Sequence, residues 1–205
     1  YSVRHEYDLA TLEEVMEEIR GNTSKPVTTT EPVGRYLNDV PLLELGDWVF
    51  PNAHPYWYDR KYPKSAVIWT VQQCNELKSV LLQTSKPDKP VLFKEVGLPS
   101  AGDPACSETN QAEYFRLLQE TTVPFAFFEA FDQPLKHEYW PDTDYDVGPH
   151  WGLFESNRSP KEVVKYLGWG TCFPSDGKGN AKDTFALREE VYVKGYGFPI
   201  NTEVD

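Results

Sequence analysis

The sequence is poor in basic residues, in cysteine and in long apolar runs. Its 20 lysine and arginine residues are outnumbered by 32 aspartate and glutamate residues, which gives a formal net charge of −12. Because nucleic acid backbones are bound by clustered basic side chains, we expect no nucleic acid partner. No apolar run reaches the length of a membrane span, and no segment has the pattern of a signal peptide. The composition therefore indicates an acidic globular chain.

Cysteine occurs only as Cys74, Cys106 and Cys172. An odd number at wide spacing predicts neither a disulfide framework nor a zinc site. One bond between Cys106 and Cys172 stays open, because both residues lie in turn-rich segments.

Aromatic residues, in contrast, make up 14% of the chain. Their flat rings suit core packing, and they also suit stacking against the apolar faces of sugars. The composition leaves both interpretations open.

Helical and strand patterns alternate along the first 170 residues. Helices are predicted at 8–20, 63–85 and 107–121, with an irregular or short helix at 35–46 and a last helix beginning at 159. Strands are predicted at 25–32, within 47–57, at 89–97 and at 123–132. Strands separated by helices require a parallel sheet with helical crossovers.

The predicted strand at 123–132 is apolar almost throughout, which indicates burial on both faces. Beyond residue 170 the alternation stops, and turn residues take over. We therefore expect a (β/α) domain over residues 1–170 and a turn-rich extension over 171–205, which could hold one strand and a tail.

Polar side chains gather where the predicted strands end. They are Glu31 after the first strand, Asn52, His54 and Tyr56 after the second, Glu95 after the third, and Glu129 with Asp132 after the fourth. In a (β/α)8 barrel these ends form the active-site face. Several carboxylates on one face favour glycoside hydrolysis, which uses one as nucleophile or base and another as acid.

Segments in this order resemble glycoside hydrolase family 17, the β-1,3-glucanase-like barrels. The most specific are "FKEVGLPSAG", "NQAEYF", "FFEAFDQPLK" and "GPHWGLF", and "PVTTTEP" and "PNAHPYW" are also similar. The family has Glu-Thr/Val-Gly-Trp-Pro-Ser where this chain has Glu-Val-Gly-Leu-Pro-Ser. The resemblance covers roughly residues 1–168 and implies an α/β fold of the (β/α)8 TIM-barrel type. Only the C-terminal half of that barrel, from about strand four or five to strand eight, is implied.

The resemblance implies that Glu95 is the nucleophile, which attacks the anomeric carbon and forms a glycosyl-enzyme intermediate. Tyr56 matches a tyrosine that would hold Glu95 ionised by a hydrogen bond, unless it is a rim tyrosine. The alternative role for Glu95 is a helix cap or a strand-end ion pair. Lys94 is an unsuitable partner for it, because strand alternation aims neighbouring side chains at opposite faces.

Further residues are candidate substrate contacts: Asn52, His54, Tyr56, Glu31, Glu129, Phe131 and Trp140. His54 could equally be a structural histidine, and Glu129 could equally shape the mouth of the barrel. Phe131 or Trp140 would form a platform for a sugar ring, whereas Trp151 is expected to pack in the core.

The general acid/base of the family is a glutamate that ends strand four, just before a helix. Glu6 is the local candidate here, unless it belongs to a surface loop, and Glu31 is a weaker stand-in. Strands one to three have no counterpart, and half a barrel exposes two strand edges. The missing half would lie on another chain, two copies would pair, or the C-terminal tail would cover the edges.

The resemblance implies a retaining glycoside hydrolase acting on β-1,3-linked glucan, or a transglycosylase with the same nucleophile. A non-catalytic carbohydrate-binding remnant and an unrelated α/β protein are the alternatives. No metal or organic cofactor is implied, because carboxylates suffice for the chemistry. A polymeric glucan favours a secreted or periplasmic location.

Overall fold

The computed structural model describes residues 8–139, 145–167, 171–175 and 192–196. The chain divides into two compact units, residues 1–164 and 165–205. The second unit contains an antiparallel pair of strands, β5 (Thr171–Ser175) and β6 (Tyr192–Tyr196). The sequence suggested one strand in this region and a domain boundary at residue 170.

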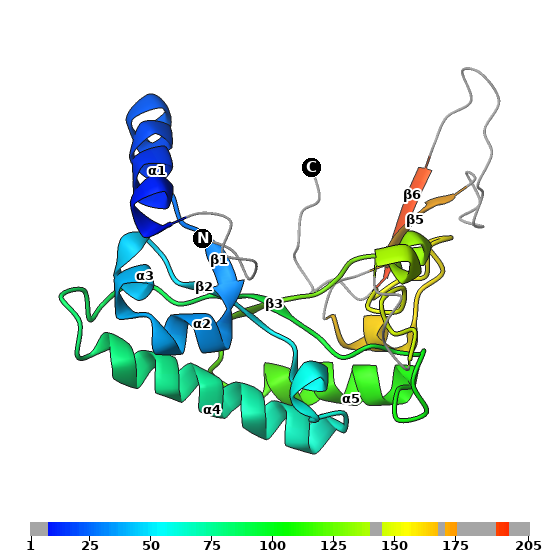
Figure 1. The fold of residues 1–205 in the computed structure, drawn as a ribbon. Coiled ribbons are helices and arrows are strands. Elements are labelled where there is room, and N and C mark those ends of the chain that lie inside the picture. The colour runs from blue at the N-terminus through cyan, green and yellow to red at the C-terminus, as the bar shows by residue number, and fades with distance from the viewer. Residues whose placement is uncertain (1–7, 140–144, 168–170, 176–191, 197–205) are drawn as a thin grey trace. The chain divides into compact units, whose positions relative to one another are not determined.

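The first unit is built on a four-stranded parallel sheet (Figure 1). Its strands are β1 (Thr30–Pro32), β2 (Phe50–Ala53), β3 (Phe93–Val96) and β4 (Phe125–Phe127), and they lie in the order of the sequence. Asn52 of β2 lies opposite Glu95 of β3. Helices separate successive strands, so the predicted α/β fold with a parallel sheet is confirmed.

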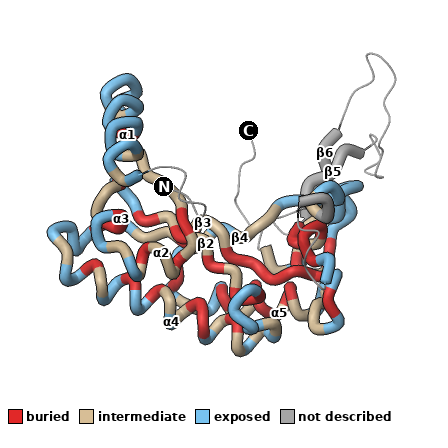
Figure 2. The backbone as a smooth tube through the Cα atoms, viewed as in Figure 1, coloured by how far each residue is buried: buried red, intermediate tan, exposed pale blue. Residues whose placement is uncertain are grey.

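Two long helices cover one face of the sheet, α4 (Pro63–Leu81) and α5 (Glu108–Gln119) (Figure 1). Pro63 starts α4 where its missing N–H costs nothing. Ser107 caps α5 by accepting a hydrogen bond from the Asn110 N–H at 3.1 Å. Figure 2 shows that buried residues concentrate between these helices and the strands, where Phe93 and Leu77 are fully buried.

Helix α1 (Leu9–Thr23) begins one residue after the predicted start and runs past the predicted stop. Asp8 caps its start by accepting from the Thr11 N–H at 2.7 Å. Its end is Ser24, which adopts a left-handed φ of 55° and donates its N–H to the Arg20 carbonyl. Most of α1 is exposed, and Met16 is its buried residue (Figure 2).

Short helical elements fill the remaining connections: α2 (Val33–Asn38), α3 (Val40–Leu45), and the 3-10 turns η1 (Pro55–Tyr58), η2 (Pro134–Tyr139) and η3 (Glu162–Tyr166). The sequence predicted one irregular or short helix where α2 and α3 lie. It also predicted a helix beginning at 159, where the structure has η3.

Strand β4 differs most from its prediction. The sequence indicated a long strand buried on both faces, but β4 spans Phe125–Phe127 and Ala126 is exposed. It pairs with β3 and ends the sheet, and no other strand of the described residues pairs with its second edge. Continuous apolarity in this segment therefore reflects packing around short elements rather than a central strand.

Within the described part of the chain, no helix combines the length and the apolar character that crossing a membrane requires. Cys74 is a buried free thiol, and Cys106 is a half-buried free thiol.

Candidate active site

Glu95 lies near the carboxyl end of β3 and lines a cavity of about 420 Å³. The cavity is lined by His54, Trp57, Glu95, Phe128, Lys136, Gly148 and Trp151. These residues follow β2, end β3 or follow β4, so the cavity lies at the carboxyl ends of the strands. The sequence prediction that strand ends bring these segments together is consistent with this arrangement.

The Glu95 carboxylate has two charged or polar neighbours. His54 Nε2 lies 3.3 Å from Oε2, and Lys94 Nζ lies 2.5 Å from Oε1. An ionised carboxylate only accepts hydrogen bonds, so Nε2 carries the proton in this contact. The Nδ1 atom is buried with no hydrogen-bond partner among the described residues, which suits a bare lone pair better than a second N–H.

These neighbours keep Glu95 ionised. Burial raises the pKa of the carboxyl group, but the hydrogen bonds from His54 and Lys94 and the positive charge of Lys94 outweigh burial. The pKa of Glu95 therefore lies below its ordinary value. A carboxylate that is ionised, partly desolvated and open to a cavity has the properties of a nucleophile or a base.

The contact between Lys94 and Glu95 corrects the expectation that they face opposite sides of the strand. The register of β3 against β4 shifts between Phe93 and Val96, so strict alternation is interrupted at these two residues. Phe93 and Val96 are both fully buried, while the two residues between them are half-buried. The long lysine side chain then reaches the neighbouring carboxylate.

Tyr56 does not hold Glu95, contrary to the expectation from sequence. Its hydroxyl donates to Asp103 Oδ2 at 2.7 Å, and Lys61 Nζ binds the same oxygen at 2.8 Å. Pro55 starts the η1 turn, which breaks the two-residue period of β2 and redirects Tyr56. His54 takes the position next to Glu95 instead.

Aromatic rings form the walls of the cavity. Trp151 is 3% exposed, and its ring meets that of His54 edge-on with centroids 4.9 Å apart. Phe128 meets His54 in the same way at 5.1 Å. Trp57 is 49% exposed, and its ring centroid lies 6.1 Å from that of Trp151. Trp151 was expected to pack in the core, and it both packs and lines the cavity.

The other predicted contacts lie beside the cavity or apart from it. Asn52 Oδ1 accepts a hydrogen bond from Thr30 Oγ1 at 2.9 Å. Glu129 is bound to Lys136 of the cavity wall, with its Oε1 at 2.5 Å from Nζ. Phe131 is 40% exposed and packs against Phe154, with centroids 5.6 Å apart.

Glu31 is buried at 2% exposure and is not part of the cavity lining. Burial raises the pKa of its carboxyl group, and nearby Arg35 opposes the rise. The proposed acid/base Glu6 and the proposed platform Trp140 lie outside the described residues.

Sequence reasoning missed Trp57, Phe128 and Lys136 as parts of the cavity. Trp57 and Phe128 stand in aromatic runs directly after strands, so their position was a usable signal. Lys136 carried none, because its ammonium reaches the site by lying over the Phe128 ring, 4.5 Å from its centroid.

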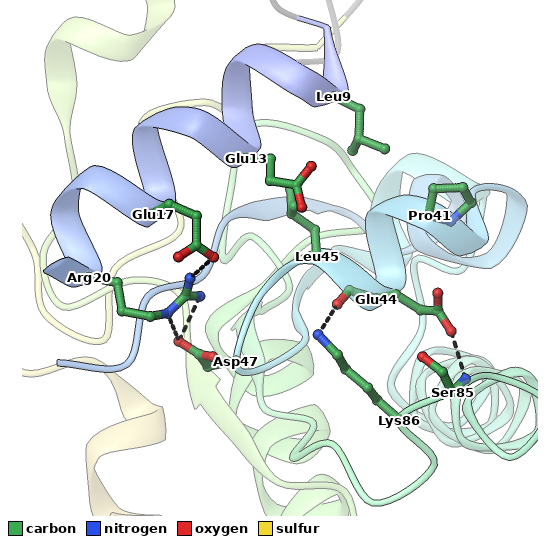
Figure 3. A pocket seen from close by; sticks show the side chains of 10 residues that line it. All are labelled: Leu9, Glu13, Glu17, Arg20, Pro41, Glu44, Leu45, Asp47, Ser85 and Lys86. Carbon is green, nitrogen blue, oxygen red and sulfur yellow. Dashed lines mark hydrogen bonds and ion pairs between the residues drawn. The ribbon is translucent and has the colours of Figure 1, made fainter. Parts of the chain in front are cut away.

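A second cavity, of about 490 Å³, lies at the opposite ends of the strands (Figure 3). Asp47 and Lys86 of its lining precede β2 and β3 in the sequence. Arg20 binds both Asp47 and Glu17, and Lys86 donates to the Glu44 carbonyl. Arg20, Glu17 and Asp47 are therefore paired with one another, and these contacts join α1 to the segment that leads into β2.

Comparison with known proteins identifies a glycoside hydrolase domain. The family model described as the BtgE/BtgC glycoside hydrolase domain matches residues 3–152. The chain is 28% identical over 171 residues to "Probable glucan endo-1,3-beta-glucosidase btgC" of Aspergillus terreus, and 27% identical over 186 residues to the protein of that name from Aspergillus clavatus. These matches cover 71% and 76% of the chain but only 24% and 25% of the relatives. The chain thus spans about a quarter of their length.

Solved structures share the fold at low identity. A glycoside hydrolase family 17 beta-1,3-glucanosyltransferase from Rhizomucor miehei superposes with a TM-score of 0.62 at 22% identity, over 78% of this chain and 58% of that one. An endo-laminarinase from Formosa gives a TM-score of 0.62 at 16% identity, over 78% and 52%.

Proposed function

The chain belongs to the BtgE/BtgC glycoside hydrolase domain family, and we propose that it cleaves β-1,3-linked glucan by a retaining mechanism with Glu95 as the nucleophile. The observation that carries this proposal is the Glu95 carboxylate, held ionised by His54 and Lys94 in a cavity with aromatic walls. The names of the two Aspergillus relatives support a β-1,3-glucan as the substrate. We also assign the parallel sheet to the C-terminal part of a family 17 barrel.

The first step would join a Glu95 oxygen to the anomeric carbon while the glycosidic C–O bond breaks. A second carboxyl group, roughly 5–5.5 Å away in retaining enzymes, gives its proton to the leaving oxygen. In the second step that group takes a proton from water, and the water oxygen displaces Glu95. A sugar hydroxyl in place of water gives transglycosylation from the same intermediate.

The second carboxyl group is proposed to be Glu6, or a group supplied by a further polypeptide or a second copy that completes the barrel. Trp57 is the best-placed platform for a sugar ring, because it is half exposed at the cavity that Glu95 lines. Apolar faces of glucose units would stack on it, with Trp151 behind it as the cavity wall. His54 is proposed to orient Glu95, a role that differs from a sugar contact.

The test compares wild type with Glu95→Gln for release of reducing sugar from laminarin. We expect release to fall to background in Glu95→Gln and to be unchanged in Glu14→Gln, which alters an exposed carboxylate of α1. Oligosaccharides longer than the substrate would identify transglycosylation. Full activity in Glu95→Gln would remove Glu95 from the mechanism.

A second measurement addresses the covalent intermediate. In Glu95→Ala, azide can occupy the space of the lost carboxylate and attack an activated aryl β-laminarioside. Formation of an α-glycosyl azide supports the retaining mechanism, because azide then enters from the face that Glu95 would use. If wild type binds laminari-oligosaccharides without cleaving them, the protein is a carbohydrate-binding member of the family instead.

A further inference from the structure

Lys161 is a buried lysine that connects two loops behind the cavity. Its side chain is 3% exposed, and Nζ donates to Ser100 Oγ at 2.7 Å and to Asp132 Oδ1 at 2.6 Å. Ser100 lies in the loop after β3, five residues beyond Glu95, and Asp132 lies in the segment after β4. One ammonium group therefore joins the chain that follows the proposed nucleophile to the chain that follows the neighbouring strand.

A serine next to a lysine suggests a nucleophile and its base, but the hydrogen bonds do not fit that role. A lysine base must accept the serine proton, whereas Lys161 Nζ here donates a hydrogen bond to Ser100 Oγ. The Ser100 hydroxyl accepts from it and donates onward to the His150 carbonyl at 3.1 Å. Both groups are engaged in hydrogen bonds that hold the chain, and they line a separate cavity of about 550 Å³ rather than the cavity of Glu95.

What they hold is the segment that carries Trp151. The His150 carbonyl, just before Trp151, accepts from the Ser100 N–H at 2.8 Å. The Gly152 N–H, just after Trp151, donates to Asp132 Oδ1 at 2.8 Å. The two partners of Lys161 thus fix the backbone on both sides of the tryptophan that forms the cavity wall.

Gln111 of α5 reinforces the same segment from within the core. It is fully buried, and its Nε2 contacts the carbonyls of Leu98, Trp151 and Gly152 at 3.1 to 3.3 Å. Gly152 permits this close packing, because a Cβ there would lie 2.2 Å from the Asp132 nitrogen.

We propose that Lys161 is a positioning residue that sets Trp151 against His54 and thereby fixes the shape of the Glu95 cavity. Trp151 contacts His54, which in turn binds Glu95, so a displaced tryptophan changes both the wall and the orientation of the carboxylate. A buried ion pair is weak support for stability, but it is well suited to selecting one arrangement of two loops. The proposal rests on the proposed function only in naming β-1,3-glucan as the ligand.

Hydrogen exchange tests the positioning without any ligand. In Lys161→Met we expect the amides of residues 150–154 to exchange about tenfold faster, while those of α4 are unchanged. Lys64→Met, a change at an exposed lysine of α4, should alter neither segment. A uniform increase across the protein would indicate a general loss of stability, and unchanged exchange at 150–154 would show that Lys161 does not fix the segment. Either result would overturn the proposal.

The double variant Lys161→Met/Asp132→Asn guards against misfolding caused by an unpaired buried carboxylate. The amide oxygen that replaces the carboxylate at position 132 can still accept from the Gly152 N–H. The link from position 161 to Ser100 is lost. We expect the faster exchange at 150–154 to persist in this double variant. Lys161→Arg should partly restore the slow exchange of the wild type. Slow exchange in the folded double variant would contradict the proposal.

Ligand binding is then measured in a Glu95→Gln background, so that no turnover interferes. We expect laminari-oligosaccharides to bind about tenfold more weakly when Lys161→Met is added, because ordering the wall costs binding free energy. Equal affinity would separate Lys161 from the cavity. If the Glu95→Gln protein itself binds no such sugar, the proposed function fails, while the exchange experiment still decides the role of Lys161.

Discussion

The Tyr56 hydroxyl donates to Asp103, 2.7 Å away, and this bond joins the loop after β2 to the loop after β3. Lys61 binds the same carboxylate, and the Ala105 N–H donates to its other oxygen at 2.7 Å. The cluster holds the η1 turn, which begins directly after His54 and contains Trp57. It therefore positions the cavity residues after β2 without touching Glu95, and this distinction can be measured.

Tyr56→Phe is expected to cost about 1 kcal/mol of stability, because Asp103 loses one hydrogen bond but keeps two others. The acid limb of the pH profile for kcat/KM on laminarin should not move, since Tyr56 does not contact Glu95. Chemical denaturation and the pH profile measure the two effects. A shift of the acid limb to higher pH would restore the role that the sequence assigned to Tyr56.

His54→Leu is expected to raise the pKa of Glu95, because burial still disfavours the carboxylate and one stabilising hydrogen bond is gone. The acid limb of kcat/KM should therefore move to higher pH. If the variant has lost activity, NMR titration of the Glu95 carboxyl carbon measures the change in pKa directly. An unchanged titration would show that the 3.3 Å contact contributes nothing to ionisation.

Asp103 is expected to make the protein sensitive to acid. Burial raises the pKa of its carboxyl group, but the bonds from Lys61, Ala105 and Tyr56 lower it below the ordinary 3.8. The unfolded chain then binds the proton more readily, so the contribution to stability is present above pH 3.8 and is lost as pH falls through the folded-state pKa.

In Asp103→Asn the free energy of unfolding should therefore fall less steeply than in wild type between about pH 5 and about pH 2. Denaturation at several pH values measures both slopes. Glu14→Asn, at an exposed site, serves as the control and should keep the wild-type slope. Identical slopes in Asp103→Asn and wild type would contradict the prediction.

Gly97→Ala is expected to destabilise the protein by about 1 to 3 kcal/mol, as overpacking does. The new Cβ would lie 2.3 Å from the Phe128 carbonyl oxygen. Gly97 directly follows β3, and Phe128 directly follows β4. Gly21→Ala is the matched control, because that position in α1 has open space around it. The control should gain roughly 0.5 to 1 kcal/mol from helix propensity. Equal midpoints of denaturation for both variants would refute the packing argument.

Much of the site could be predicted because strand ends are visible in the sequence. The apolar run before Glu95 and the Gly-Leu-Pro turn after it located the carboxylate near the end of β3. The two-residue period of β2 also predicts which way His54 faces. Asn52 lies opposite Glu95, and two residues further along the strand the chain returns to the same face.

The remaining features depend on local departures from regular geometry. The irregular register at Lys94 and the η1 turn that contains Tyr56 each change where one side chain points, and single-residue propensities do not encode such shifts. The contacts of Lys161 join segments 29 and 61 residues away in the chain. Tertiary packing decides such pairs, which is why Lys161 drew no attention in the sequence.

The four-stranded sheet has a consequence for how the stability of the protein is measured. Among the described strands, β1 and β4 each pair on one side only, so their outer backbone groups can accept another strand. Any polypeptide that binds there stabilises the folded state by mass action. The melting temperature of this chain is therefore expected to depend on its concentration and on the other polypeptides in the sample. Both should be reported with it.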